Sequence, residues 1–362
     1  MKKAVIAGMG IQGAAIAYGL QKLGYEVLGI DISEENLRNA SDILSRFGYT
    51  FTRLHGDALK LFDKIVEYAP DVFISALPFH LNYDLAEKCI ENGIRYCDLG
   101  GNVGTAENIR TSASKHGSDK PVMTDQGLAP GIANIIADIG YRSIGSADSV
   151  KIRVGGLPVD PKGTLKYGLT FNPQGLYNEY IDTCFVLRDG EKTTVEPLGD
   201  VEIINFDGLG DMEAFNTSGG IADLLDTMQA KGVKECDYKT IRFPGHVGLI
   251  RFMLFECKMD LVTFSNTVIN ACGFINNDQV LIYIDVSDAG SGKSWRLKSI
   301  VKHDETFTAM QKTTGFGAAA VAAILGDGVM DGKPVAGYAD VPTVEFVWNM
   351  RELLPELEIV VH

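Results

Sequence analysis

One glycine-rich turn near the N-terminus constrains the fold more than any other feature of the sequence. The run "KAVIAGMGIQG" (residues 3–13) begins with the apolar residues Ala4–Ala7 and then places Gly8, Gly10 and Gly13 in a G-x-G-x-x-G pattern. A secretory signal would continue its apolar stretch up to a small-residue cleavage site. Here the apolar run breaks after four residues and a helical repeat follows. The pattern therefore predicts a strand, a tight turn and a helix.

This turn has the residue types that a dinucleotide-binding site requires. Gly8 permits the sharp turn, Gly10 leaves room for a pyrophosphate, and Gly13 lets the helix pack close to the strand. The phosphates would then lie at the free N–H groups and the positive end of the helix. The residues expected to contact the cofactor here are Gly8, Gly10, Ile11, Gln12 and Gly13.

An acidic residue follows at the distance expected for recognition of the adenosine ribose. The second predicted strand, "YEVLGID", ends at Asp31, 18 residues after Gly13. A carboxylate at this place accepts hydrogen bonds from the ribose hydroxyls and repels a 2′-phosphate. The next residues are Ile32 and Ser33, with no arginine beside Asp31. The sequence therefore favours NAD over NADP, and the alternative is an ordinary helix-capping or surface aspartate.

Strands and helices continue to alternate up to about residue 125. Further strands are predicted at "YTFTRLHGD", "PDVFISALP", "GIRYCDLGGN" and "KPVMTDQG". Helices are predicted between them at Glu34–Phe47, Leu59–Tyr68, Leu81–Asn92 and Ala106–Lys115. This alternation indicates a Rossmann-type, doubly wound parallel sheet, in which ligands bind at the carboxyl ends of the strands. Further cofactor contacts are therefore expected at Asp57, Leu77, Pro78, Asp98 and Gly127. Asp98 could orient the cofactor or the substrate, or it could only cap its turn.

The pattern changes at about residue 148 to β-branched and alternating segments. Strands are predicted at "SVKIRVGG", "LKYGLTF", "TCFVLRDGEKTTV", "VEIINF", "YKTIRF" and "QVLIYIDV", with helices at Ile221–Ala230 and His246–Phe255. We interpret this half as a second, α+β domain with a largely antiparallel sheet. The predicted domains are residues 1–130 for the dinucleotide and 131–305 for substrate binding and dimerisation. The segment from about 306 to 362, with its small-residue helix, is expected to pack back on the first domain.

Composition argues against several classes of partner. The 362-residue chain has a net charge of −14 and no basic block, so nucleic acid and anionic membranes are poor candidates. No stretch reaches the roughly 18 apolar residues that a membrane helix needs. The six cysteines form no C-x-x-C pair, and no Cys/His cluster has zinc spacing. We therefore expect a cytoplasmic protein without a metal site that acts on a small molecule. The size of the second sheet domain suggests a homodimer formed through that domain.

Several longer blocks resemble the saccharopine dehydrogenase family, and within it the short lysine 6-dehydrogenases. They are "ALPFH" (76–80), "DLGGN" (98–102), "DQGLAPGIAN" (125–134), "GGLP" (155–158), "LKYGLTFNPQGLYNEY" (165–180), "MEAFNTSGG" (212–220), "TIRFPGH" (240–246) and "TAMQKTTGFGAAAVAAIL" (308–325). The resemblance implies NAD-dependent oxidative deamination of L-lysine at the ε-amino group. The semialdehyde product would cyclise to a piperideine carboxylate.

Two alternatives to a lysine 6-dehydrogenase stay open. Related enzymes for saccharopine or carboxynorspermidine share several of the blocks, although the chain lacks room for the larger inserted domain of long saccharopine reductases. An alternative of another class is a non-catalytic NAD-binding sensor. A sensor would have no reason to carry "FNPQGLYNEY" and "RFPGH" in its second half.

By resemblance, three residues are candidates for the chemistry. His80 follows a strand end near the expected nicotinamide, and its alternative role is to start a helix. Asp125 ends the sixth predicted strand and is expected to contact the substrate ammonium, or to form a turn. Lys166 and Tyr167 are expected in a strand, where neighbouring side chains point to opposite faces, and we choose Lys166 for the cleft.

Four residues of the second half are candidates for binding the substrate. Arg242 and His246 flank "FPG" and are expected to bind a carboxylate, since arginine offers two parallel donors. Glu213 is expected to face inward, where a carboxylate is costly unless a cationic substrate or a protein Arg or Lys pairs with it. Asn172 in "FNPQG" is either a turn former or a ligand contact.

Overall fold

The structure is a computed structural model, and it describes residues 1–361. The chain forms two compact units. The first comprises Met1–Ile135 and Gln311–Leu357, and the second comprises Ile136–Met310 and the short segment from Glu358. The assignment of the cofactor and the substrate to separate domains stays a prediction.

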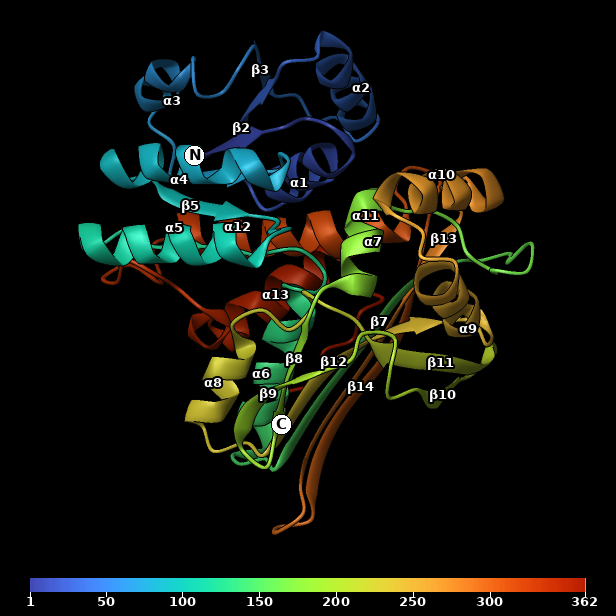
Figure 1. The fold of residues 1–362 in the computed structure, drawn as a ribbon. Coiled ribbons are helices and arrows are strands. Elements are labelled where there is room, and N and C mark those ends of the chain that lie inside the picture. Colours follow the sequence, from blue (N-terminus) through green and yellow to red (C-terminus); the bar gives the residue numbers. More distant parts are fainter. Residues whose placement is uncertain (362) are drawn as a thin grey trace. The chain divides into compact units, whose positions relative to one another are not determined.

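The first unit contains a six-stranded parallel sheet in the order β3-β2-β1-β4-β5-β6. Strands β2, β3 and β5 are labelled in Figure 1. Its strands are β1 (Lys2–Ala7), β2 (Tyr25–Asp31), β3 (Thr52–His55), β4 (Val72–Ser75), β5 (Arg95–Asp98) and β6 (Val122–Met123). The order reverses between β1 and β4, as in doubly wound folds, and ligands bind such sheets at this reversal. The predicted Rossmann-type sheet is confirmed.

Helices connect these strands at nearly the predicted places. They are α1 (Ile11–Lys22), α2 (Glu34–Ser45), α3 (Phe62–Tyr68), α4 (Asn82–Glu91) and α5 (Val103–His116), followed late in the chain by α12 (Gly317–Gly326) and α13 (Thr343–Leu353). Three short helical turns complete the unit at Phe79–Leu81, Lys312–Phe316 and Tyr338–Asp340. The sequence pattern did not predict α13.

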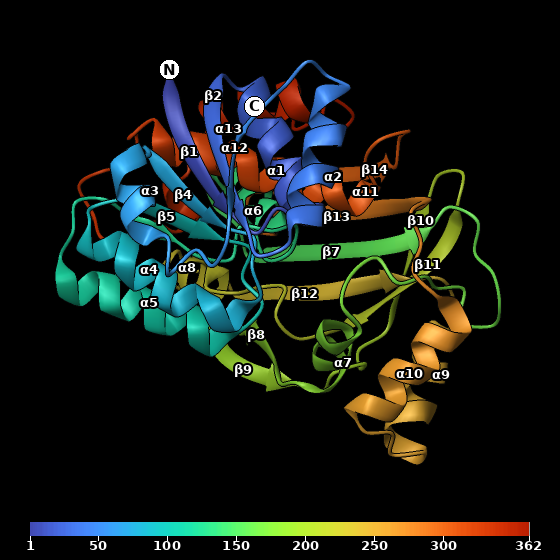
Figure 2. The same ribbon diagram turned by 90° about the horizontal axis from the view of Figure 1, so that it is seen from above.

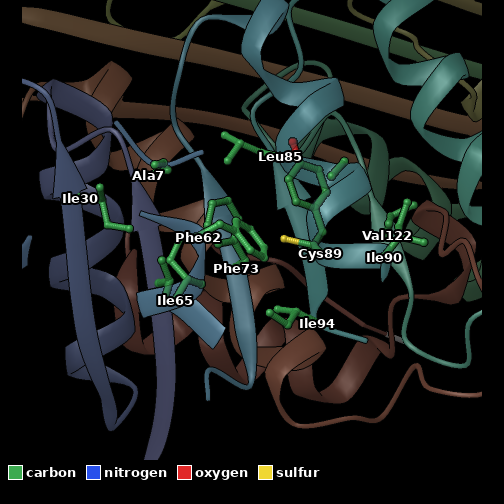
Figure 3. Close-up of a cluster of buried hydrophobic side chains, with 14 of the residues drawn as sticks. Ala7, Ile30, Phe62, Ile65, Phe73, Leu85, Cys89, Ile90, Ile94 and Val122 are labelled. Carbon is green, nitrogen blue, oxygen red and sulfur yellow. The ribbon is translucent and has the colours of Figure 1, made fainter. Parts of the chain in front are cut away.

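The core of this unit lies between the sheet and its helices (Figure 3). All four residues of β4 are buried, as expected for a strand covered on both faces. All ten residues of α12 are also buried. A Cβ added at Gly19 would lie 2.6 Å from the Cβ of Ala319, so small residues on both helices allow α1 and α12 to pack closely.

The second unit contains a mixed sheet of eight strands, mostly antiparallel. Six strands follow the order β10-β11-β12-β7-β13-β14, and a hairpin of β8 and β9 joins at β12. The strands are β7 (Ser149–Pro158), β8 (Cys184–Arg188), β9 (Glu191–Val195), β10 (Glu202–Phe206), β11 (Gly210–Asn216), β12 (Glu235–Arg242), β13 (Asp278–Asp288) and β14 (Lys293–Lys302). Only β7 and β12 pair in parallel among these strands, and they lie side by side in Figure 2.

Several helices of the later chain were missing from the sequence prediction. The helices are α6 (Ile132–Ile144), α7 (Pro173–Ile181), α8 (Leu224–Ala230), α9 (His246–Arg251) with a π-helical turn (Phe252–Glu256), α10 (Leu261–Cys272) and the short α11 (Ala309–Gln311). We predicted α8 and α9 but not α6, α7, α10 or strand β14. The predicted strand at "LKYGLTF" is wrong. Gly163 and Lys166 adopt left-handed φ values of +66° and +49°, which turn the chain.

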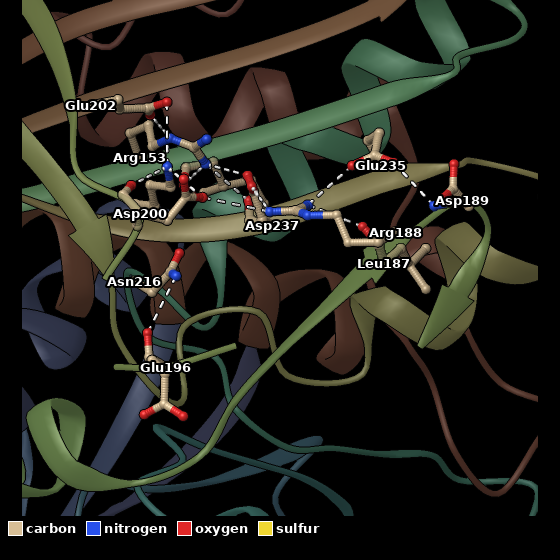
Figure 4. A network of polar contacts seen from close by, with 12 residues as sticks. Arg153, Leu187, Arg188, Asp189, Glu196, Asp200, Glu202, Asn216, Glu235 and Asp237 are labelled. Atoms are coloured by element: carbon tan, nitrogen blue, oxygen red, sulfur yellow. Dashed lines mark hydrogen bonds and ion pairs between the residues drawn. The ribbon is translucent and has the colours of Figure 1, made fainter. Parts of the chain in front are cut away.

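A buried network of charges joins the strands at the middle of this sheet (Figure 4). Arg153 on β7 is only 1% exposed and forms ion pairs with Asp237 (2.6 Å) and Glu202. Arg188 donates to Asp237 at 2.9 Å. A hollow of about 400 Å³ lies beside them, and its lining has four basic and four acidic side chains, so the charges balance within the protein. We infer that this network stabilises the sheet.

Candidate functional site

The turn after β1 is shaped by its glycines. Gly8 has a φ of +92°, and a Cβ at this position would lie 2.7 Å from the carbonyl oxygen of Ala76. A Cβ at Gly13 would overlap the carbonyl oxygen of Gly8, whereas a Cβ at Gly10 would meet nothing within 4 Å. The first and last glycines are therefore needed for packing. Gly10 leaves open space over the turn, as a pyrophosphate requires.

The start of α1 leaves its hydrogen-bond donors available. Within residues 1–361 no side chain caps this helix, and its first turn holds no acidic residue. Ile11 is 72% exposed, and the Oε1 atom of Gln12 is buried with no hydrogen-bond partner in the described chain. Since the first N–H groups of a helix need an acceptor, this helix end fits a phosphate group.

Asp31 is fixed at the end of β2. Its carboxylate accepts hydrogen bonds from the backbone N–H groups of Met9 and Ser33, both at 2.7 Å, and from the side-chain amide of Asn36 at 3.2 Å. A carboxylate has about four acceptor positions, so one remains for a ribose hydroxyl. The contact of Asp31 with an adenosine ribose stays a prediction.

The other predicted cofactor contacts on this edge differ in their local roles. The Asp57 carboxylate accepts from the N–H of Leu59 at 2.9 Å, so it also stabilises its own turn. Leu77 lies against Gly8, where an added Cβ would be 3.0 Å from Leu77 Cδ2. Pro78 is exposed at the start of a short helical turn. His80 is exposed in that turn and meets the ring of Phe79 edge-on.

Asp98 organises the two loops at the ends of β5 and β6. Its Oδ1 accepts from the N–H groups of Gly100 (2.8 Å) and Asp125 (3.1 Å), and its Oδ2 accepts from Tyr96 Oη (3.0 Å). Burial raises the pKa of Asp98, against the lowering effect of these donors. The side chain is 1% exposed, so the structure uses Asp98 mainly to hold the loops together.

The backbone of the loop at Asp125 is strained, and the Asp125 carboxylate is already paired with an arginine of the protein. Asp125 has a φ of +65°, which is uncommon for a residue with a side chain. Its carboxylate accepts from Thr124 Oγ1 at 3.0 Å and pairs with Arg110 Nη1 at 3.3 Å. Sequence reasoning missed Arg110, which lies mid-helix in α5. Asp125 therefore shares its charge with the protein, and its contact with a substrate ammonium stays a prediction.

A late segment of the chain supports both the glycine turn and the Asp125 loop. Gln311 Nε2 donates to the carbonyl oxygen of Ile11 at 3.0 Å. A Cβ at Gly315 would lie 2.5 Å from Ala15 Cβ, and a Cβ at Gly127 would lie 3.7 Å from Thr314 Cγ2. The π-helical turn at Lys312–Phe316 thus packs behind the start of α1.

We expect Gly315→Ala to weaken cofactor binding about tenfold, roughly 1.4 kcal/mol. The new methyl group would press on Ala15 and displace the start of α1. Fluorescence titration with NADH measures this change. Gly104→Ala is the matched control, because an added Cβ there meets only Asn102 Oδ1, at 3.4 Å. Equal affinities of both variants and the wild type would contradict the role of this contact.

In the second unit, His246, Tyr180 and Arg242 form one buried chain of hydrogen bonds. His246 Nδ1 lies 3.1 Å from the Leu165 carbonyl oxygen, so this nitrogen carries the proton. His246 Nε2, 3.1 Å from Tyr180 Oη, must then accept the tyrosine proton. The same Tyr180 oxygen accepts from Arg242 Nε at 3.2 Å. Burial, with a further effect of Arg242, lowers the pKa of His246 to about 3.

These hydrogen bonds make His246 a neutral residue that holds the Tyr180 hydroxyl in place. Both of its ring nitrogens are used inside the protein, which differs from the carboxylate contact that we predicted. Arg242 is 3% exposed, donates to the Ile241 carbonyl oxygen at 3.0 Å and stacks on the ring of Tyr167 at 4.8 Å. Within residues 1–361 it has no carboxylate within 4.0 Å. A buried guanidinium of this kind fits an anionic ligand.

Glu213 lies opposite Arg242 in the register of β11 and β12, but its carboxylate points to other partners. Oε1 accepts from the N–H of Val247 at 2.6 Å and Oε2 from the N–H of Gly245 at 3.0 Å. The start of α9 therefore satisfies this buried carboxylate. We had expected a cationic substrate or a protein cation as its partner, and two backbone N–H groups take that place.

The remaining two candidates have local roles in the structure. Asn172 Oδ1 accepts from the N–H of Gln174 at 2.9 Å and caps α7. Lys166 is exposed in a turn instead of alternating with Tyr167 in a strand. Sequence reasoning also missed Glu179 and Tyr180 within the quoted block "FNPQGLYNEY". Nothing in the sequence indicated that Tyr180 would accept a hydrogen bond from Arg242.

Two family models match consecutive parts of the chain. The saccharopine dehydrogenase NADP binding domain matches residues 4–126, and the saccharopine dehydrogenase C-terminal domain matches residues 127–354. The chain belongs to the saccharopine dehydrogenase family. Membership makes it an NAD(P)-dependent amine dehydrogenase, so it is an enzyme that uses a nicotinamide dinucleotide. The resemblance inferred from the sequence blocks is confirmed.

A solved structure shows the same fold. Apo saccharopine dehydrogenase (L-Glu forming) from Saccharomyces cerevisiae aligns with a TM-score of 0.72 at 14% identity, covering 98% of each chain. An amine dehydrogenase from Mycobacterium smegmatis aligns with a TM-score of 0.46 at 12% identity, covering 94% of this chain and 95% of the other.

Within residues 1–361, no helix is long and apolar enough to cross a bilayer, and no group of three or more metal-ligating side chains occurs.

Proposed function

We propose that this enzyme oxidises the ε-amino group of L-lysine with NAD. The observation that carries the proposal is the buried Arg242, which has Tyr180 and Tyr167 around it and no carboxylate partner within the described chain. The α-carboxylate of an amino acid would supply that partner. The hydrogen bond between Tyr180 and His246 would keep the Tyr180 oxygen directed at the guanidinium.

The proposed reaction requires a neutral amine at the far end of the substrate. A nicotinamide bound at the glycine turn would supply the acceptor for a hydride from the ε-carbon of lysine. The nitrogen lone pair stabilises the iminium that this loss creates. Water then adds to the iminium, ammonia leaves, and the semialdehyde cyclises with its own α-amino group, losing water. Because a free lysine amine has a pKa near ~10.4, the oxidation should run faster under alkaline conditions.

For the cofactor, we expect NAD to be preferred over NADP by at least tenfold, about 1.4 kcal/mol. Asp31 at the end of β2 would repel the 2′-phosphate, and no arginine follows it. Asp31→Ser should narrow the preference, although it also removes a support of the turn at Met9. Steady-state kinetics with both cofactors measure the ratio. Equal constants for NAD and NADP in the wild type would refute this part of the proposal.

An absorbance assay at the NADH band tests the substrate. L-Lysine, L-ornithine, L-saccharopine and cadaverine are each offered with NAD at alkaline pH. The proposal predicts that lysine gives the highest kcat/KM. If saccharopine is oxidised well and lysine is not, the family assignment stands and the proposed substrate is wrong.

A further inference from the structure

Tyr167 carries a buried hydroxyl group that the protein leaves without a hydrogen bond. The residue is 4% exposed, and its Oη atom has no hydrogen-bond partner within residues 1–361. A buried hydroxyl in this state destabilises the folded protein, because it has lost its bonds to water and gained none in exchange. Buried polar groups are nearly always bonded, so an exception of this kind indicates a functional role.

The ring of Tyr167 contacts two residues of the hydrogen-bond chain at Arg242. The Cζ atom of Arg242 lies 4.8 Å from the centre of the ring. The ring of His246 meets it edge-on, with the two centres 5.3 Å apart. Since the hydroxyl is attached to the ring that the guanidinium contacts, an anion bound by that guanidinium would lie close to the hydroxyl. Both groups are donors, so they could share one acceptor.

The ring of Tyr167 is held in one position by its surroundings. It belongs to a buried apolar cluster that includes Phe264. The chain just after it is fixed by Leu169, whose N–H donates to the Gly273 carbonyl oxygen at 2.9 Å and whose carbonyl accepts from the N–H of Ile275 at 3.0 Å. The hydroxyl is therefore a fixed donor, which a ligand can use without a further loss of side-chain freedom.

Burial also keeps this hydroxyl protonated. It raises the pKa of Tyr167 well above the ordinary value, and the guanidinium of Arg242 lowers that pKa by less. An ordinary tyrosine, with a pKa near ~10, would begin to ionise under the alkaline conditions proposed for the reaction. Tyr167 stays a neutral donor there, so it does not repel a carboxylate.

We propose that the Tyr167 hydroxyl donates a hydrogen bond to the α-carboxylate of the substrate bound at Arg242. Tyr167 then takes the place in the site that we assigned from the sequence to Lys166, which is exposed. This inference deepens the proposed function and rests on it for the presence of a carboxylate. The bound carboxylate supplies the acceptor that the hydroxyl lacks in the protein, so substrate binding offsets the cost of burying it.

Tyr167→Phe tests the inference, because it removes the hydroxyl and keeps the ring beside Arg242. Calorimetry in the presence of NADH should show a roughly 10- to 100-fold weaker affinity for L-lysine, the effect of one hydrogen bond to a charged group. Inhibition by cadaverine, which lacks the carboxylate, should stay within about threefold of the wild type. Without ligand, the variant should melt about 1–3 °C higher than the wild type, because an unbonded buried hydroxyl is gone.

Two further tyrosines provide the comparison. Tyr177→Phe is the matched control, since Tyr177 is a partly buried residue of α7 whose ring lies 5.5 Å from that of Phe264, and it should change neither affinity nor melting temperature. Tyr180→Phe should instead lower the melting temperature, because the Tyr180 hydroxyl is bonded to both Arg242 and His246.

An unchanged affinity of Tyr167→Phe for lysine overturns the inference, whatever its melting temperature. Equal losses for lysine and cadaverine, together with a lower melting temperature, would show that the hydroxyl supports the fold and would overturn it too. If the variant binds lysine more weakly as expected but the wild type does not oxidise lysine, the inference stands and only the proposed reaction fails. If the wild type binds saccharopine and not lysine, the proposed substrate is wrong, and the same comparison with saccharopine, which also carries α-carboxylates, decides the role of the hydroxyl.

Discussion

Arg242→Lys should raise the Michaelis constant for L-lysine by about 30-fold, roughly 2 kcal/mol, and change the constant for NAD by far less. The guanidinium donates to Tyr180 and to the Ile241 carbonyl oxygen, which leaves further donors for a carboxylate. A lysine ammonium keeps the charge but has no planar fork, so it cannot hold Tyr180 and a carboxylate in the same geometry. Steady-state kinetics with each substrate varied in turn measure both constants.

Arg251→Lys is the control for this substitution. Arg251 is an exposed arginine of α9 that donates to the Leu198 carbonyl oxygen at 3.3 Å, away from the hydrogen-bond chain of Arg242. It should leave both Michaelis constants near the wild-type values. If Arg242→Lys also behaves like the wild type, then Arg242 only supports the packing of Tyr167 and Tyr180, and the carboxylate binds elsewhere.

Removing the carboxylate of the substrate and shortening its side chain should each reduce catalysis, for different physical reasons. Cadaverine keeps the reacting amine but lacks the carboxylate, so Arg242 would stay buried and unpaired at a cost of about 1–3 kcal/mol. Ornithine keeps the head group but is one methylene shorter. Its reacting carbon would miss the attack position, which can cost on the order of 10²-fold in rate. Lysine should therefore exceed both in kcat/KM.

The two losses should appear in different kinetic constants. Cadaverine should show mainly a raised Michaelis constant, whereas ornithine should bind through its head group and show mainly a lowered kcat. Inhibition constants against lysine check the binding of each compound directly. Oxidation of cadaverine as efficient as that of lysine would exclude a carboxylate site at Arg242.

Local chemistry explains why the cofactor half was predictable. Gly8 and Gly13 are required by contacts within a few residues of the turn or with the adjacent strand, and Asp31 closes the next strand. Each of these constraints requires a particular type of residue at a fixed spacing in the sequence. Strands β1 and β4 were equally visible, because strands buried on both faces are continuous apolar runs.

The substrate half depends on contacts between distant residues, and these require no fixed spacing. Glu213 is an acidic residue beside apolar ones, and only the fold shows that two backbone N–H groups at the start of α9 satisfy its carboxylate. The pair of Asp125 and Arg110 is equally invisible in sequence. Lys166 was misplaced because nothing in "LKYGLTF" indicates that its backbone adopts a positive φ.

The most direct test of the proposed function is the stoichiometry of the reaction with L-lysine. Purified enzyme is incubated with L-lysine labelled with ¹⁵N at the ε-position and NAD at alkaline pH, and NADH and labelled ammonia are both measured. The proposal predicts equal amounts of NADH and labelled ammonia, together with a cyclic imine. NADH formed with release of the unlabelled α-nitrogen, or no NADH from lysine while saccharopine is oxidised, would contradict ε-deamination of lysine.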